Sequence, residues 1–442
     1  MLTLFASTTA LVSPPRVVVL GGTGRIGSYA AAHLLGVCEK PIEVVLAGRD
    51  AERGASAVQE VRSMACALPS FERGSTVIYQ GLDFQDGSAL SKAVEGAAAV
   101  VHTAGPYAGE EPDVLKAAIA ARVPVYVDLS DPVEYLDAAA ALDEDAKAAG
   151  TLALSAAGAF PGLSNVLAME CAAQLGEPVH DLDFSYFTAG LGGSGEINLY
   201  ITNEGFGEPV PVFRGGRYSP QMEAGGESRK VDFFLDESEP SYRQVGERSV
   251  WSWPFPEGCT VARQLRISGD SSVGMGTAPE LWNVVLGAMV AAVPRGWWRV
   301  RGFSNGLAQF SKPLVALTDG FVGETHAMRV DAAARSGRRV SAVQAHRSFR
   351  EVVGSSCAEF TAALLESRGL VERVGGGPDA TLPASSGVFM PEALFEPASA
   401  RQPLLERLLA IEGTLNWAFE VAEAGAGGKT TVSSALGKDL SV

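Results

Sequence analysis

A glycine-rich segment near the start of the chain has the residue types and spacing of a phosphate-binding loop. Gly22, Gly24 and Gly27 give the spacing G-x-G-x-x-G between a β-branched run, 17–20, and an alanine-rich helical segment, 28–35. The first glycine of such a loop permits a tight turn, the second lets the backbone approach a pyrophosphate, and the third lets the helix pack on the sheet. The helix dipole then faces the anion. This context predicts a dinucleotide site, and the alternative is a glycine turn without a ligand.

The second predicted strand, 42–47, ends at residues that would choose between the two nicotinamide dinucleotides. An acidic residue at this position binds the ribose 2′-hydroxyl of NAD. Here the strand is followed by Gly48 and Arg49, a small residue that leaves room for a phosphate and a guanidinium that binds one. Arg25 adds a second positive charge. The tip predicts NADP, with NADPH as the reduced form; the alternative is that Arg49 is a surface arginine and Asp50 holds the ribose.

The predicted cofactor site combines the glycine loop with the tips of the second, third and fourth strands. The residues assigned to cofactor binding are Gly21, Gly22, Thr23, Gly24, Arg25, Ile26, Gly27, Arg49, Asp83, Ala104, Gly105 and Pro106.

A substrate would lie beside the nicotinamide, in the crevice at the carboxyl ends of the strands. The segments expected there are 104–107, 128–131 and 158–165. Tyr107 is the side chain best suited to donate a proton to a carbonyl or imine, and we assign it as the catalytic acid. The alternative is that Tyr107 stacks on the nicotinamide or lines the pocket.

The other polar residues of the crevice favour structural roles. We expect Asp128 to cap a turn, with ribose binding as the alternative, and His102 to pack beside the sheet, with acid–base work as the alternative. None of the tyrosines has a lysine four residues later, the pair used by short-chain dehydrogenases, and no G-x-S-x-G elbow is present. No C-x-x-C or H-E-x-x-H arrangement occurs, so no metal is predicted.

Strands and helices alternate from residue 16 to about 160, as a doubly wound parallel sheet requires. The expected strands are 17–20, 42–47, 76–82, 97–103, 124–129 and 151–156. The expected helices between them are 28–35, 51–65, 88–94, 112–122 and 132–149. Later segments predict helices at 163–175, 355–365 and 404–419, and strands at 181–189, 326–333 and 339–349.

An apolar run of 13 residues, 281–293, is followed by Pro294 and by a cluster of arginines and tryptophans, 295–301. The run is shorter than the roughly 20 residues that a membrane-spanning helix needs. We predict a buried core helix, because such runs usually fill a core. The alternative is a helix lying in the plane of a membrane surface, with an aromatic and basic flank.

Composition limits the function classes. The net charge of −16 disfavours nucleic acid and anionic surfaces as general partners. The hydrophobic fraction of 47% and the charged fraction of 19% are those of a globular protein. The five scattered cysteines predict free thiols in a reducing compartment.

Several segments together resemble the saccharopine dehydrogenase-like proteins of the saccharopine reductase type, most closely a branch found in cyanobacteria and plastids. The resemblance rests on 100–107, 125–130 and 158–165, and then on 275–283, 328–331 and 387–392. It implies NADP-dependent reduction or oxidation, in a Rossmann domain followed by an α/β substrate domain. The family's aspartate after the Pro-Gly of the sixth strand and its G-G-L-P-A-P-E loop are both missing here. Saccharopine is therefore not the predicted substrate.

The expected fold class is α/β, a Rossmann-type doubly wound parallel sheet with a second, mixed-sheet α/β domain. We expect a loose extension at 1–15, the NADP-binding domain at 16–160 and a substrate or oligomerisation domain at 161–380. C-terminal helices at 381–422 should return toward the first domain, and 423–442 should be a disordered tail.

These observations predict an NADP-dependent oxidoreductase that transfers a hydride to or from a carbonyl, imine or enoyl group of a small-molecule substrate. One alternative is a non-catalytic NADP-binding sensor or assembly factor. Another is a lipid-associated reductase with peripheral membrane contact through 281–301. We expect a homodimer in the cytoplasm or plastid stroma, no nucleic-acid partner and no transmembrane helix.

Overall fold

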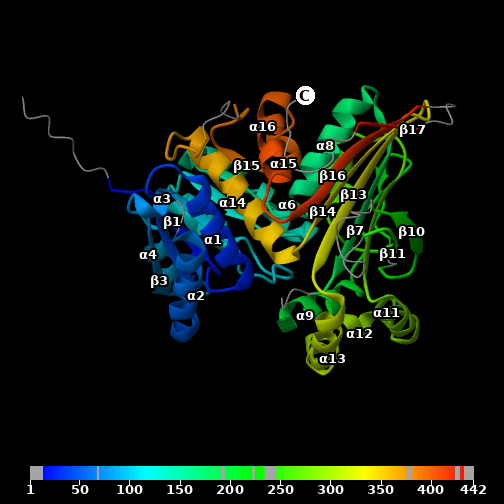
Figure 1. Cartoon of the computed structure of the whole chain (residues 1–442), viewed down its shortest axis with the longest axis horizontal. Helices are drawn as coiled ribbons and strands as arrows, with labels where there is room; N and C mark the ends of the chain where they lie inside the picture. The colour runs from blue at the N-terminus through cyan, green and yellow to red at the C-terminus, as the bar shows by residue number, and fades with distance from the viewer. Residues whose placement is uncertain are drawn as a thin grey trace, which may run out of the picture.

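Two β-sheets with helices packed on and between them make up the chain (Figure 1). The computed structural model describes residues 13–66, 69–190, 195–221, 224–233, 245–375, 381–423 and 429–432. The expected extension at 1–15 lies mostly outside the described residues. The α/β class with a parallel first sheet and a mixed second sheet is confirmed.

The first sheet is entirely parallel and has the order β15-β6-β5-β4-β1-β2-β3. Its strands are β1 (Arg16–Leu20), β2 (Glu43–Gly48), β3 (Thr76–Gly81), β4 (Ala99–His102), β5 (Val125–Asp128), β6 (Leu152–Leu154) and β15 (Gly387–Phe389). The central strands β4 and β5 are buried along their whole length and mostly apolar, because helices cover both faces. The six predicted strands are present. The seventh, β15, comes from the far end of the chain and pairs with β6.

The helices of this half are α1 (Arg25–Val37), α2 (Ala51–Ala65), α3 (Pro69–Glu72), α4 (Gly87–Val94), α5 (Asp113–Ala120), α6 (Val133–Ala140) and α7 (Asp143–Ala149). The single helix predicted over 132–149 is wrong, because α6 and α7 are separate. Asp143 begins α7, where three acidic residues favour the positive helix end. Its Oδ1 also accepts a hydrogen bond of 2.9 Å from the Val388 amide of β15. The break between α6 and α7 therefore places Asp143 where it hydrogen-bonds β15, the strand that comes from the far end of the chain.

The second sheet has the order β10-β11-β12-β7-β13-β14-β16-β17 and is antiparallel except where β12 pairs with β7. Its strands are β7 (Val179–Ala189), β10 (Ser228–Asp232), β11 (Glu247–Ser252), β12 (Ser271–Ala278), β13 (Thr325–Ala334), β14 (Arg339–His346), β16 (Thr414–Ala422) and β17 (Lys429–Val432). A small two-stranded sheet pairs β8 (Phe213–Arg214) with β9 (Arg217–Tyr218). The strands predicted at 326–333 and 339–349 are present as β13 and β14, which pair antiparallel.

Two predictions near the C-terminus differ from the structure. The helix predicted over 404–419 is wrong beyond α16 (Ala398–Leu409), since β16 begins at Thr414 and pairs with β14. Gly413, at φ 93°, makes the left-handed turn between them, a conformation that favours glycine. In the expected disordered tail, β17 pairs with β16, and the remainder after Glu423 lies outside the described residues.

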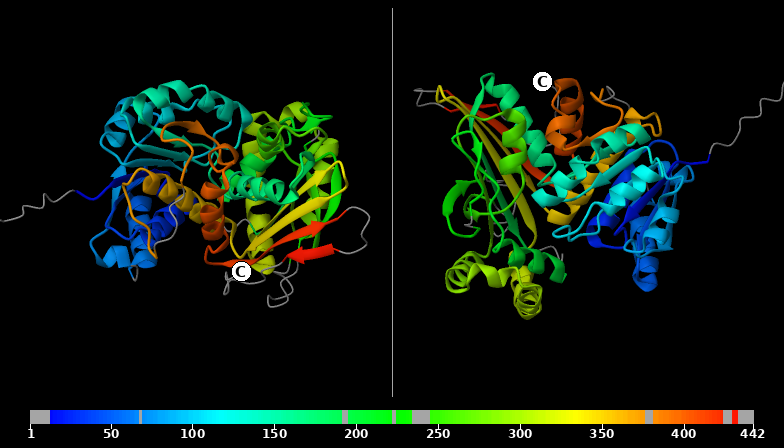
Figure 2. Two further views of the ribbon diagram at one scale, coloured as in Figure 1. Left: turned by 90° about the horizontal axis from the view of Figure 1, so that it is seen from above. Right: turned by 180° about the vertical axis from the view of Figure 1, so that it is seen from behind.

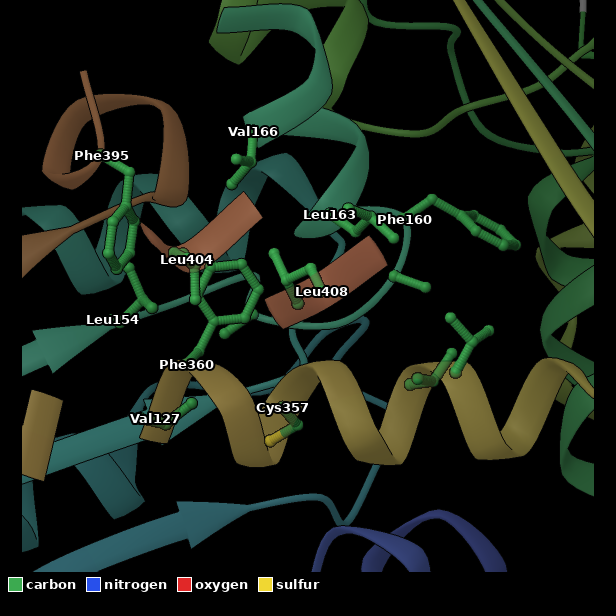
Figure 3. Close-up of a cluster of buried hydrophobic side chains, with 14 of the residues drawn as sticks. Val127, Leu154, Phe160, Leu163, Val166, Cys357, Phe360, Phe395, Leu404 and Leu408 are labelled. Carbon is green, nitrogen blue, oxygen red and sulfur yellow. The ribbon is translucent and has the colours of Figure 1, made fainter. Parts of the chain in front are cut away.

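The remaining helices are α8 (Leu163–Leu175), α9 (Gly195–Gly205), α10 (Glu257–Leu265), α11 (Glu280–Ala292), α12 (Arg295–Trp298), α13 (Arg301–Val322), α14 (Phe349–Ser367) and α15 (Pro391–Leu394). Helices α8, α14 and α16 lie between the two sheets in all views (Figure 2). The close-up in Figure 3 shows Val127 and Leu154 of the first sheet in one cluster with Leu163, Phe360 and Leu404 of these helices. One continuous core therefore joins the two halves.

Helix α14 fixes the helix of the glycine loop from the C-terminal side. A Cβ on Gly354 would lie 2.8 Å from the Ile26 carbonyl oxygen, so α14 contacts the backbone of α1 directly. The chain thus returns to the first domain at α14, inside the range 161–380 predicted for the substrate domain. The predicted domain boundaries themselves stay a prediction.

The apolar run 281–293 does not form a core helix, and that prediction is wrong. It forms α11, in which Asn283 is the one buried residue, while Leu281 and Val284 are each 63% exposed. Helices α9, α11, α12 and α13 gather at one end of the molecule, beyond the end of the eight-stranded sheet (Figure 1). One side of the run, with Leu286, Met289, Val290 and Val293, is half-buried against the main core, and the other side stays exposed. Among the described residues, no helix combines the length and apolarity needed to cross a membrane.

Candidate cofactor site

The glycine loop makes a tight turn off β1. Gly21 has φ 75°, and its amide donates a hydrogen bond of 3.1 Å to the Ala47 carbonyl of β2. The Gly22 amide then donates to the Val19 carbonyl at 3.1 Å, and the Gly24 amide to the Gly21 carbonyl at 2.8 Å. These bonds turn the chain by its own backbone and leave α1 to begin at Arg25.

The three glycines of the motif differ in what a side chain would meet. A Cβ on Gly27 would lie 2.4 Å from the Gly21 carbonyl oxygen, and one on Gly22 would lie 2.8 Å from the Val19 carbonyl oxygen. Both positions therefore exclude side chains by backbone contact. A Cβ on Gly24 would meet only the Gly21 oxygen, at 3.0 Å. Gly24 is thus the least enclosed of the three, as the glycine that approaches a pyrophosphate must be.

The N-terminus of α1 lacks a cap. Gly24 is the N-cap residue, no side chain accepts from the helix amides, and the first turn holds no acidic residue. The first-turn amides of a helix have no intrahelical partners, so they stay available to an anion at the positive end of the dipole. These residues fit the pyrophosphate of a dinucleotide.

The contacts at the end of β2 bear on which residue faces the ribose, Arg49 binding a 2′-phosphate or Asp50 binding a 2′-hydroxyl. The Asp50 carboxylate caps α2, accepting from the Glu52 amide at 3.0 Å and the Arg53 amide at 3.1 Å. It is thus already in use, which disfavours the alternative in which it holds the ribose. Arg49 is exposed and forms no hydrogen bond or ion pair with the described part of the chain. Its guanidinium is available for a 2′-phosphate.

The remaining predicted residues lie at neighbouring strand ends of the same sheet edge. A Cβ on Gly21 would lie 2.9 Å from the Ala104 amide nitrogen, so the loop after β4 packs on the glycine loop. Gly105 is exposed and Pro106 half-buried beside it. Asp83, after β3, is exposed and accepts from the Gln85 amide at 3.2 Å. Asp83 therefore stabilises its own turn, two strands away from the glycine loop.

Tyr107 is held away from acid–base work by its contacts. Its hydroxyl donates to the His102 carbonyl at 2.6 Å and accepts from the Leu129 amide at 3.3 Å. Burial raises the pKa of Tyr107 well above its ordinary value. These contacts favour the alternative in which Tyr107 lines the crevice, and its role as the acid stays a prediction. The expected packing of His102 is confirmed: burial lowers its pKa to about 3, and Phe84 and Tyr107 contact it edge-on.

Two aspartates follow β5 and have opposite surroundings. Asp128 is fully buried and accepts from the Ser130 hydroxyl at 2.6 Å and the Ala156 amide at 3.1 Å, which confirms the capping role. Asp131 is half-buried and forms no hydrogen bond with another described residue. Burial raises the pKa of Asp131 to about 6. No pattern in the sequence distinguishes these two carboxylates.

A buried polar cluster sits where the two halves meet, and sequence reasoning missed it. Glu257 Oε1 accepts from the Tyr186 hydroxyl at 2.5 Å and the Ser164 hydroxyl at 2.9 Å. Asn165 donates to Glu392 at 2.7 Å. Burial raises the pKa of Glu257 to about 7. The partners come from α8, β7, α10 and α15, so no local spacing could have indicated them.

Comparisons with known proteins agree with the site. Residues 17–154 match the family model described as "Saccharopine dehydrogenase NADP binding domain". A search of the curated proteins found no match. The family-model match, over less than half of the chain, agrees with the family resemblance for that segment and indicates an NADP-binding domain there. The cofactor is therefore NADP or NADPH, while the roles of individual residues and the plastid or cyanobacterial branch stay predictions.

Solved structures match at low identity. A mutant of meso-dapdh from Clostridium tetani, with DAP, is 13% identical over 88% of this chain and 96% of that chain, with a TM-score of 0.40. Pen from Bacillus thuringiensis is 22% identical over 26% of this chain and 37% of that chain, with a TM-score of 0.20. The chain covers less than half of the first solved structures that it matches.

We predict opposite effects for valine at two glycines of the loop. Gly24→Val should remain folded, because Gly24 has an extended backbone (φ −87°) and its Cβ would meet a single atom, the Gly21 carbonyl oxygen at 3.0 Å, yet it should abolish NADPH binding. Gly27→Val should lower the free energy of unfolding by more than about 2 kcal/mol, since its side chain meets the Gly21 backbone. Thermal unfolding and calorimetric titration measure both effects. Retained binding by Gly24→Val would contradict the loop assignment.

Removing the guanidinium at the β2 tip should change cofactor preference. Arg49→Ala should weaken NADPH binding about 10- to 100-fold, the contribution of hydrogen bonds to a charged group, and leave NADH binding nearly unchanged. Arg73→Ala is the matched control, since Arg73 precedes β3 at the opposite sheet edge and pairs with Glu39. Titration of both dinucleotides measures the ratio. An equal loss for both would refute the phosphate assignment.

Glu257 should make stability depend on pH. Its raised pKa means that the folded state binds more protons than the unfolded state between pH 4.5 and about 7. Stability should therefore fall as the pH rises through this window, by about 3 kcal/mol in total. Glu257→Gln should remove this fall in denaturant titrations, whereas Glu95→Gln, at an exposed position, should retain it. Parallel pH profiles for Glu257→Gln and the unaltered protein would show that Glu257 titrates normally.

Proposed function

We propose that the chain is an NADP-dependent oxidoreductase that transfers a hydride to or from a carbonyl, imine or enoyl carbon of a small molecule. The observation that carries this proposal is the uncapped, open N-terminus of α1 beside an unpaired Arg49, with Asp50 already used as a cap. NADPH, when bound, supplies the hydride. The residues of the chain bind the dinucleotide, orient it and supply a proton.

The proton in a carbonyl reduction would come from a group at the carboxyl ends of the strands. Asp131 suits this role because it follows β5, is half-buried and lacks a basic partner among the described residues. With a pKa of about 6, a minor fraction of Asp131 is protonated near neutral pH, and this fraction can donate its proton to a substrate. Tyr107 is the second candidate, and its hydroxyl would first have to leave the His102 carbonyl.

The segment after β6 supports a substrate other than saccharopine. Ser164 and Asn165 stand near the place where saccharopine reductases carry an aspartate for the amino-acid ligand. Here they bond to the buried Glu257 and Glu392 instead. No charged anchor for a zwitterion is presented there, and an unpaired buried charge on a ligand would be costly.

One observation favours a non-catalytic NADP-binding sensor as the second candidate. The hydroxyl of Tyr107 is held by the backbone, so the one tyrosine of the crevice has no free proton to offer. The buried free thiols Cys38, Cys171, Cys259 and Cys357 support a reducing compartment, the cytoplasm or the plastid stroma, for either function.

Turnover assays with paired variants test the proposal. NADPH oxidation should be detected with at least one member of a carbonyl, imine and enoyl library. Asp131→Asn should lower kcat about 100-fold, remove a titration near pH 6 from the rate profile and leave NADPH affinity unchanged. Tyr107→Phe should retain most activity. Tight NADPH binding without turnover of any library member would favour the sensor, and a larger loss for Tyr107→Phe would restore Tyr107 as the acid.

A further inference from the structure

Large apolar side chains exposed to solvent gather on three helices, α11, α12 and α13, and on their junctions. In the described part of the chain, eleven such side chains are exposed, and eight of them lie between residues 281 and 321. These eight are Leu281, Val284, Trp297, Val300, Phe310, Leu314, Leu317 and Phe321. Monomeric surfaces seldom concentrate apolar groups in this way unless the patch binds something. We call the surface made by these eight residues the apolar face.

On α13 the apolar face is a stripe at helical spacing. Phe310, Leu314, Leu317 and Phe321 are separated by four, three and four residues, so they share one side of the helix. Phe310 is 72% and Phe321 is 78% exposed. The pattern is that of an amphipathic helix whose apolar side is exposed among the residues that the structure describes.

The opposite sides of α13 and α12 pack against α9 and its neighbourhood, so the helices that carry the apolar face are held in place by buried contacts. Ser304 is fully buried, and its carbonyl accepts a hydrogen bond of 3.0 Å from the Asn203 side chain of α9. Trp298 is also fully buried, with its ring centroid 5.1 Å from that of Phe206. Its neighbour Trp297 is 59% exposed. Of the two adjacent tryptophans, only Trp297 is thus available to a partner.

The charge around the apolar face is mainly positive: in the sequence Glu280 precedes the face and Asp319 lies within it, and Arg299 pairs with Glu208 at 3.3 Å. Residues 281–318 contain Arg295, Arg299, Arg301 and Lys312 and no aspartate or glutamate, although the whole chain carries a net charge of −16. A two-fold contact between two copies of this face would bring basic residues against basic residues. An anionic lipid surface is complementary in charge and takes the apolar stripe below its headgroups.

We propose that α11, α12 and α13 lie in the plane of an anionic lipid surface, with the apolar face buried and Trp297 at the headgroup level. This arrangement extends the sequence-based alternative of contact through 281–301 onto α13 and assigns Trp298 to the core instead. Aromatic and basic residues flanking an in-plane apolar face are the usual features of such docking.

Vesicle flotation of the full chain without cofactor tests the proposal. The unaltered protein should float with vesicles of equal parts phosphatidylcholine and phosphatidylglycerol, and less with phosphatidylcholine alone. The double variant Phe310→Ser, Phe321→Ser should lower the bound fraction at least about tenfold, since it removes two exposed rings without touching the core. The control double variant Ile78→Ser, Val374→Ser removes exposed apolar groups elsewhere and should float like the unaltered protein.

Two results would overturn the docking. One is the absence of flotation by the unaltered protein with the anionic vesicles. The other is a concentration-dependent dimer, seen by ultracentrifugation, that the Phe310, Phe321 variant abolishes without any change in flotation; this would assign the face to a second copy. NADPH titration of the same samples is independent, so failure to bind cofactor would refute the proposed function and leave the docking intact.

Discussion

The contact on which the site depends is the close approach of α1 to the end of β1. Gly27 lies against the Gly21 carbonyl so tightly that no Cβ fits, and Gly354 of α14 presses on the backbone of the same helix from the other side. Because the helix is fixed at both places, its uncapped amides are held in position before any ligand arrives. A preorganised anion site does not have to be ordered by the ligand, which improves affinity.

The C-terminal third of the chain also helps to hold α1 and the parallel sheet in position. Helix α14 packs on α1, β15 extends the parallel sheet beside β6, and the buried Glu257 cluster joins α8 to α10 and α15. Elements from the second half of the chain thus pack directly on the helices and strands of the cofactor domain. A carboxyl group such as Glu257, protonated in part near neutral pH, lies in that shared core.

Local signals in the sequence were sufficient to predict the strands and most helices of the cofactor domain. The glycine spacing, the alternation of strands and helices and the Gly48–Arg49 tip are all short-range patterns, and α2 and α8 have the predicted bounds. Non-local features were not predictable. β15 is a three-residue strand defined only by its pairing with β6, and Glu257 meets Tyr186 across 71 positions. The exposure of α11 depends on where the chain carries it, since its composition alone resembles that of a core helix.

The central claim is that the α1 amides hold a diphosphate while Arg49 selects the phosphorylated nucleotide. Calorimetric titration of the unaltered protein with NADPH and with NADH tests it most directly. The account predicts saturable one-to-one binding of NADPH, with NADH at least about tenfold weaker because it lacks the phosphate that Arg49 binds. Equal affinity for both dinucleotides, or no heat from either at millimolar concentration, would contradict it.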